Sequence, residues 1–200
     1  MANKTKYVTL DAELEYAQVF LENRDMGNEQ VDHSDTDGMY KVTLILDEDG
    51  MNKAIEAGCP EKQAAHIQFK PFERDGKTLY KFTVRRPHIH PRFMVMDEDG
   101  QPTDQRLILG PPQVFDLNIA KKAWEAAEQK GRLDQYSTAW TLEDGMIGNG
   151  SKAKVKLAVA SGVGVHGKAK GKTFTKVELM GVGLTNIVEY VGGNSTGGWE

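Results

Sequence analysis

Lysines recur at every second position in one short stretch of the chain, at Lys152, Lys154 and Lys156. Apolar residues fill the positions between them, and this alternation predicts a β-strand that is buried on one face. The three ammonium groups would then form a row on the exposed face, about 6.5–7 Å apart. Such a row either holds the phosphates of an extended nucleic-acid strand or is solvated surface. The lysine row alone does not decide between the two.

Two further segments combine positive charge with aromatic rings. Lys172, Phe174 and Lys176 alternate onto one face of a later predicted strand, and residues 66–93 are rich in basic and aromatic side chains. A base stacked on an exposed ring, with cations on the neighbouring phosphates, is typical of sequence-tolerant single-strand binding. In residues 66–93 we expect phosphate contacts from Lys70, Lys81, Arg85, Arg86 and Arg92, and stacking from Phe72 and Phe93.

The charge of the chain is unevenly distributed. Its 200 residues carry a formal net charge of −4, from 25 Lys and Arg against 29 Asp and Glu. Residues 1–50 hold twelve acidic and four basic residues, whereas residues 151–200 hold three acidic and seven basic. The asymmetry favours an electrostatic partner for one surface, although it equally serves solubility.

Other motifs are too incomplete to predict a cofactor or a metal. Residues 162–167 match GxGxxG, but a basic stretch and a strand follow where a dinucleotide site needs a helix. Residues 33–38 resemble half of a calcium loop, with Leu44 where the closing glutamate should be. His88 and His90 lie between two prolines without a third ligand nearby. We therefore expect no cofactor.

Cysteine content and hydropathy suggest the compartment. Cys59 is the only cysteine, which excludes an intrachain disulfide and fits a reducing compartment. No apolar run approaches the length that crosses a membrane. We therefore expect no membrane association.

Short strands outnumber helices in the predicted elements. We expect strands at 16–21, 39–46, 65–72, 78–86, 93–96, 114–117, 136–142, 152–160, 172–180 and 182–191. Helices are expected at 52–57 and 118–130, and turns at 47–50, 73–77 and 97–100. Tyr80 and Phe82 share a face with Val84 and are assigned to the core. The pattern predicts a mainly β fold and suits a five-stranded Greek-key barrel of the oligonucleotide-binding (OB) kind.

The chain resembles the OB-fold single-stranded DNA-binding proteins of tailed bacteriophages over residues 14–192. The resemblance rests on residues 16–20, residues 40–46, the Ile147-Gly148-Asn149-Gly150-Ser151 segment with its alternating strand, residues 174–179 and residues 184–190. Each segment is modest alone, and their order and spacing together carry the resemblance.

The resemblance implies a single OB-fold DNA-binding domain at 1–192, with a helix between its third and fourth strands and additional hairpin and loop insertions. It implies sequence-tolerant binding of single-stranded DNA during phage replication and recombination, in the cytoplasm of the infected bacterial host, without catalysis. Family members often end in an acidic tail that contacts replication proteins such as the polymerase and the helicase/primase. Residues 193–200 would be a flexible tail that departs from this pattern, because it holds one acid. The residues leave the oligomeric state open, a homodimer included.

Two alternatives remain open from the residues. A β-rich interaction or structural module would present the lysine row to an acidic partner or to solvent. A metal-dependent nuclease would use His88, His90 and the acidic loops, and it is the weaker alternative because a ligand set is missing.

Overall fold

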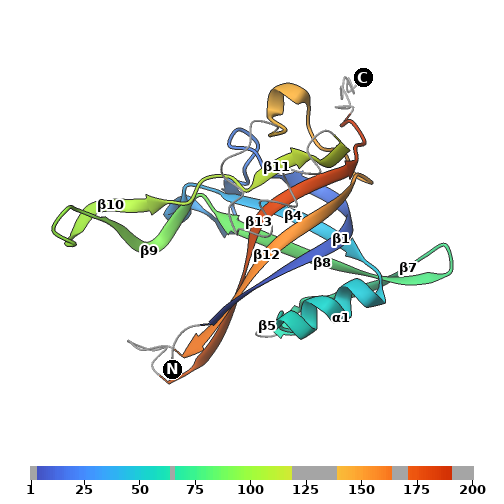
Figure 1. Cartoon of the computed structure of the whole chain (residues 1–200), viewed down its shortest axis with the longest axis horizontal. Helices are drawn as coiled ribbons and strands as arrows, with labels where there is room; N and C mark the ends of the chain where they lie inside the picture. Colours follow the sequence, from blue (N-terminus) through green and yellow to red (C-terminus); the bar gives the residue numbers. More distant parts are fainter. Residues whose placement is uncertain (1–3, 64–65, 119–138, 164–170, 191–200) are drawn as a thin grey trace.

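The fold is mainly β and is built on one mixed sheet of seven strands (Figure 1). The computed structural model describes residues 4–63, 66–118, 139–163 and 171–190. The sheet contains β1 (Lys4–Gln18), β4 (Met39–Leu46), β7 (Lys70–Arg74), β8 (Lys77–Pro87), β11 (Gln113–Asp116), β12 (Lys152–Val163) and β13 (Thr173–Asn186). Their order is β11-β13-β12-β1-β4-β8-β7. The β11–β13 pair is parallel and every other pair is antiparallel.

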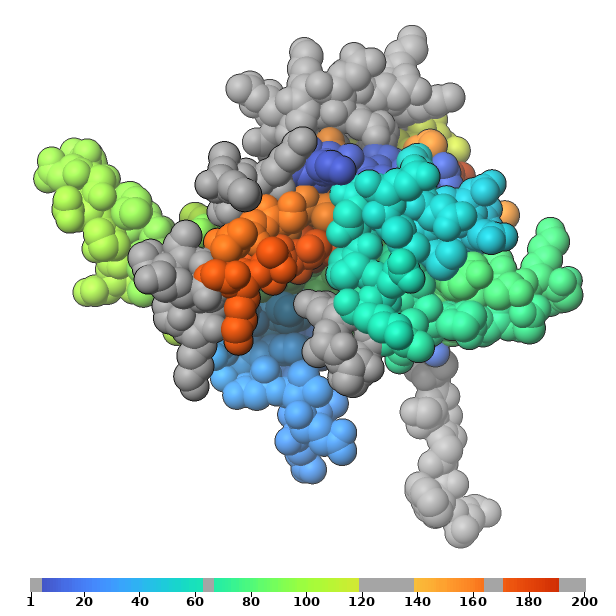
Figure 2. All heavy atoms as spheres, turned by 90° about the horizontal axis from the view of Figure 1, so that it is seen from below, coloured from blue at the N-terminus to red at the C-terminus, as the bar shows by residue number. Residues whose placement is uncertain are grey.

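The remaining helices and strands lie outside this sheet. Helix α1 (Glu48–Ala57) follows β4, and short turns of 3₁₀ helix occur at Ser34–Thr36 and Leu142–Asp144. The short strands β2 (Gly27–Asn28) and β3 (Val31–Asp32) pair with each other, as do β5 (Lys62–Gln63) and β6 (His66–Ile67). Strands β9 (Ile89–Met96) and β10 (Pro102–Ile108) form a hairpin, here called the arm, which projects clear of the sheet (Figures 1 and 2).

Strand β1 is shared by two neighbours along its length. Its residues from Lys4 to Glu13 pair with β12, and those from Glu13 to Gln18 pair with β4. Alternate side chains of β1 and β12 point into one core, because successive side chains on a strand face opposite ways. Leu10, Leu14, Val155 and Leu157 are fully buried there. The charged residues between them lie on the opposite, outer face.

The Gly148–Ser151 turn fastens the start of β12 to the end of β1. The buried Ser151 hydroxyl donates to the Gly148 carbonyl at 2.8 Å and accepts from the Val188 N–H at 3.0 Å. The Gly150 N–H donates to the Leu14 carbonyl at 2.9 Å. A Cβ on Gly148 would lie 2.6 Å from the Val188 carbonyl oxygen, so only glycine fits this close approach. The turn thus joins three segments that are distant in sequence.

Beside this turn, β1 contains a bulge at Tyr16. The pairing with β4 shifts register between Glu15 and Gln18, and Tyr16 has a φ of 52°. That conformation costs a residue with a side chain roughly 1–2 kcal/mol. The Tyr16 N–H donates to the Asn149 side-chain oxygen at 2.8 Å, so the turn also holds the bulge in place.

Several sequence predictions are confirmed here. Strands form at 39–46 and across the hairpin whose turn is Asp75-Gly76, and helix α1 ends at Ala57 with Gly58 as its C-cap. Phe82 is buried in the core, and the partly buried Tyr80 packs against it. The described residues contain no helix long and apolar enough to cross a membrane.

Other predictions are wrong. The first strand is not at 16–21 but runs from Lys4 to Gln18, and the two strands expected at 172–180 and 182–191 are one continuous β13. The segment 47–50 is not a turn, because Asp47 caps α1 by accepting from the Gly50 N–H at 2.8 Å. Most of the predicted helix at 118–130, part of residues 162–167 and the tail at 193–200 lie outside the described residues.

Replacing Gly148 by alanine should destabilise the fold by about 1–3 kcal/mol, because the added methyl group meets backbone that cannot rotate away. Chemical denaturation followed by circular dichroism measures this. Gly50→Ala is the matched control, since its Cβ would meet only side-chain atoms of Asp47 and Leu46, at 3.2 Å or more. An unchanged midpoint for Gly148→Ala would contradict the role assigned to the turn.

Candidate nucleic-acid interface

The lysine row of β12 lies on the outer face opposite an acidic row of β1. In the strand register, Lys152 is opposite Glu13, and Lys154 is opposite Asp11. The Lys154 ammonium lies 3.1 Å from the Asp11 carboxylate. Lys156 is only 4% exposed, and its ammonium lies 5.5 Å from the centre of the Tyr7 ring. The expectation of three exposed lysines is therefore wrong for Lys156.

The acidic row is also paired with cations on its other side. The Lys81 ammonium lies 2.7 Å from Glu15, and Arg74 binds both oxygens of Glu13 at 2.7 and 2.8 Å. The hydrogen bond from Arg74 lowers the pKa of the Glu13 carboxyl below its ordinary value, although burial opposes this. Much of the positive charge expected to bind phosphate is thus neutralised within the protein.

Some predicted cations keep their charge available. Within the described residues these side chains are exposed and form no ion pair: Lys70, Arg85, Arg92, Lys152 and Lys172. Phe72 is only half-buried, and the Lys81 ammonium lies 5.1 Å from its ring centre. More cations are therefore available to bind phosphate around β8, the arm and the start of β13 than at the centre of the lysine row.

Arg85 and Arg86 are adjacent but lie in different environments. The Arg86 guanidinium is largely buried, 2.7 Å from Glu178, and it also donates to the carbonyls of Leu109 and Gly110. It therefore ties β8 to β13 and to the segment that follows the arm. Its donors are already occupied by these internal partners, whereas Arg85 faces solvent.

An aromatic stack forms at the base of the arm. The rings of His90 and Phe93 are parallel within 3°, with their centres 4.0 Å apart. The His90 Nδ1 accepts from the Arg92 and Phe93 N–H groups at 3.1 and 2.9 Å, and this fixes the imidazole. Phe93 remains 62% exposed. One exposed ring is therefore held in place next in sequence to Arg92, which forms no ion pair within the described part of the chain.

The base of the arm lies close to β13. Burial of the ring, and then the positive charge of Lys176, lower the pKa of His90, which keeps the imidazole neutral near pH 7. Phe174 shares a side of β13 with Lys176 and is 44% exposed. Lys176 is also paired with Glu178 at 2.8 Å. We call His90, Arg92, Phe93, Phe174 and Lys176 the arm-base surface.

The lysine row and Phe174, which the sequence pattern grouped into one binding surface, lie apart in the structure. Phe174 is opposite Gly162 in the β12–β13 register, six residues beyond Lys156. Six residues of strand span roughly 20 Å. The exposed ring of Phe174 therefore lies well away from the lysine row along β12 and β13.

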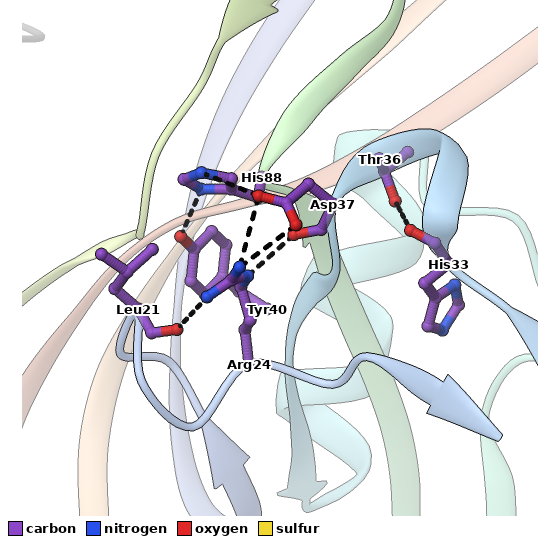
Figure 3. Close-up of polar contacts among 7 residues, drawn as sticks. All are labelled: Leu21, Arg24, His33, Thr36, Asp37, Tyr40 and His88. Carbon is purple, nitrogen blue, oxygen red and sulfur yellow. Dashed lines mark hydrogen bonds and ion pairs between the residues drawn. The ribbon is translucent and has the colours of Figure 1, made fainter.

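A polar cluster fixes the point where β8 leads into the arm (Figure 3). The buried Tyr40 hydroxyl lies 2.7 Å from His88 Nδ1, and His88 Nε2 lies 3.7 Å from Asp37. Arg24 binds both the carboxylate and the backbone carbonyl of Asp37, and it donates to the Leu21 carbonyl. Because burial raises the pKa of Tyr40, its hydroxyl stays protonated. The cluster thus joins residues 21–37 to the start of the arm.

The predicted histidines and acidic loops do not form a metal centre in the described part of the chain, where no three His, Cys, Asp or Glu side chains are grouped suitably. His88 is engaged by Tyr40, and His90 by its own turn and Phe93. Asp37, in the calcium-like segment, is bound by Arg24. Burial raises the pKa of the Cys59 thiol to about 11, so this core residue carries little thiolate at neutral pH.

Three features of this interface were not predicted. The stack of His90 on Phe93 depends on a local turn, although a histidine and a phenylalanine three residues apart give a weak signal. The pairing of Arg86 with Glu178 joins residues 92 apart in sequence and has no local signature. The exposed ring of Tyr16 follows from a bulge that only strand pairing creates.

Comparisons with protein-family models, with curated proteins and with solved structures gave no match to this chain. The function must therefore be argued from the residues and their geometry.

Truncating Arg86 should destabilise the protein by about 2–4 kcal/mol, because Glu178 and two carbonyls lose a buried donor. Arg85→Ala is the matched control, and its exposed side chain should change stability by no more than about 0.5 kcal/mol. Thermal unfolding of both variants measures the difference. Equal stability of the two variants would rule out the structural role of Arg86.

Replacing Lys176 by alanine should raise the pKa of His90, because a neighbouring positive charge disfavours the imidazolium. An NMR titration of the His90 ring protons reports this shift directly. Lys70→Ala serves as the control, since Lys70 is not among the charges that act on His90. If the Lys176 variant titrates like the parent protein, the arm base is not beside β13 in solution.

Proposed function

We propose that this protein binds single-stranded DNA without sequence preference and uses the arm-base surface as its main contact. The observation that carries the proposal is the Phe93 ring, which is exposed and stacked on His90, a residue on which the positive charges of Lys176 and Arg92 act. A base can extend this stack on the open face of Phe93. Base–aromatic stacking contributes about 1–3 kcal/mol for each base and is tolerant of sequence.

The exposed cations supply the sequence-independent part of the binding. Arg92 and Lys172 have no carboxylate partner among the described residues, and Arg85 lies on the outer face of β8, the strand that leads into the arm. Cations that contact phosphates release bound counterions, which makes affinity fall with salt. The compensated residues Lys81, Lys154 and Lys156 contribute less, because their charges already have partners or lie buried.

We further propose that the sheet closes as a five-stranded OB barrel of β1, β4, β8, β12 and β13. Three features support this topology: β1, β4 and β8 pair successively, β12 returns to pair with β1, and the Arg86–Glu178 ion pair links β8 to β13. The OB fold binds oligonucleotides on an outer face and in the loops beside it. The phage single-stranded DNA-binding family suggested by the sequence would place this activity in replication and recombination within the infected cell.

A fluorescence anisotropy titration with labelled (dT)20 at several salt concentrations tests the function. We expect affinity to fall steeply as salt rises, by a logarithmic slope of about −0.7 for each phosphate contacted. Phe93→Ala should weaken binding roughly fivefold or more through the lost stack. Met96→Ala, which removes an equally exposed apolar side chain of the arm, should bind like the parent protein.

Two results would contradict the proposal. One is the absence of binding to (dT)20 at low salt. The other is equal affinity for duplex DNA of the same length, because a duplex cannot place its paired bases on an exposed ring.

A further inference from the structure

Tyr16 combines a strained backbone with an exposed side chain. Its φ of 52° lies in the left-handed region, and it occupies a bulge position where glycine is the usual residue. Its ring is 65% exposed, so burial of the ring does not offset the strain. A strained residue that gains no packing is a candidate for function.

The backbone of Tyr16 is held by a dedicated contact. Its N–H donates to the Asn149 side-chain oxygen at 2.8 Å, and Asn149 belongs to the turn fastened by Ser151 and Val188. The bulge itself lies between Glu15, which pairs with Lys81, and Gln18. The position of the Tyr16 backbone is therefore well defined although its ring is exposed.

The surroundings of Tyr16 suit a nucleic-acid strand. Glu13 is opposite Lys152 and β1 runs antiparallel to β12, so the Tyr16 backbone lies just beyond the exposed end of the lysine row. On the other side, Gln18 is opposite Lys41, and Lys41 is opposite Arg85. Lys152 and Arg85 are both exposed and free of ion pairs within the described residues. An available cation therefore lies on each side of this part of β1, Lys152 on the neighbouring β12 and Arg85 on β8, across β4.

We infer that Tyr16 is a second base-stacking residue, held by Asn149 between the phosphate-binding cations Lys152 and Arg85. This inference rests on the proposed single-stranded DNA binding and extends it to a position away from the arm base. Regular strand alternation would place Tyr16 on the same buried face as Leu14, two residues earlier. The bulge turns the Tyr16 ring outward instead. The strain at Tyr16 is then retained for binding rather than for folding.

A series of substitutions at Tyr16 separates the ring from the backbone strain. Tyr16→Gly relieves the strain and removes the ring, so we expect an unchanged or higher melting temperature together with roughly 5- to 100-fold weaker binding of (dT)20. Tyr16→Phe keeps the ring and should bind like the parent protein. Tyr16→Asn tolerates the left-handed conformation without a ring and should match the glycine variant in binding.

Photo-crosslinking to an oligonucleotide that contains 5-iododeoxyuridine gives an independent readout, with the adduct located by mass spectrometry. We expect an adduct at Tyr16 that disappears in Tyr16→Gly. If Tyr16→Gly binds (dT)20 as tightly as the parent protein, or if it melts at a markedly lower temperature, the inference fails while the proposed function stands. If the parent protein itself does not bind (dT)20, the proposed function fails.

Discussion

The double pairing of β1 is the constraint on which the rest of the structure depends. Strand β1 pairs with β12 over its first ten residues and with β4 over the rest, and the pairing passes from one to the other at Glu13. The Gly148–Ser151 turn holds the junction by bonding to Leu14 on one side and to Val188 on the other. The bulge at Tyr16 accommodates the change in direction, as bulges do where a strand bends. The positions of the core, the outer face and the bulge all follow from the pairing of β1 with both strands.

The same strand determines the electrostatics of the outer face. Its acidic side chains lie between cations from β12 on one side and from β7 and β8 on the other. Exposed ion pairs of this kind add little stability, but they do neutralise charge locally. The cations that have no carboxylate partner among the described residues are consequently at the margins of the face and near the arm. A count of lysines and arginines along the sequence cannot distinguish these two groups.

The sequence predicted local features well and contacts between distant segments poorly. The Asp75-Gly76 hairpin and the termination of α1 by Gly58, which caps it after Ala57, depend on a few neighbouring residues, and both are confirmed. The missed start of β1 did have a signal, because Val8, Leu10 and Leu14 alternate with polar residues just as the lysine strand does. The burial of Lys156 had no signal in the local sequence, because it depends on Tyr7 from the neighbouring strand. The roles proposed for Phe93 and Tyr16 likewise depend on partners, a turn and a bulge that composition does not reveal.

The arm carries features that oppose assembly through its edges. A two-stranded ribbon has two open edges, and an open edge is a template on which another strand can assemble. Pro91 and Pro102 lack the N–H groups that such assembly needs. The turn at its tip carries Asp97, Glu98 and Asp99, which repel a second tip. The ribbon can therefore expose its apolar side chains to solvent while resisting the growth of an intermolecular sheet.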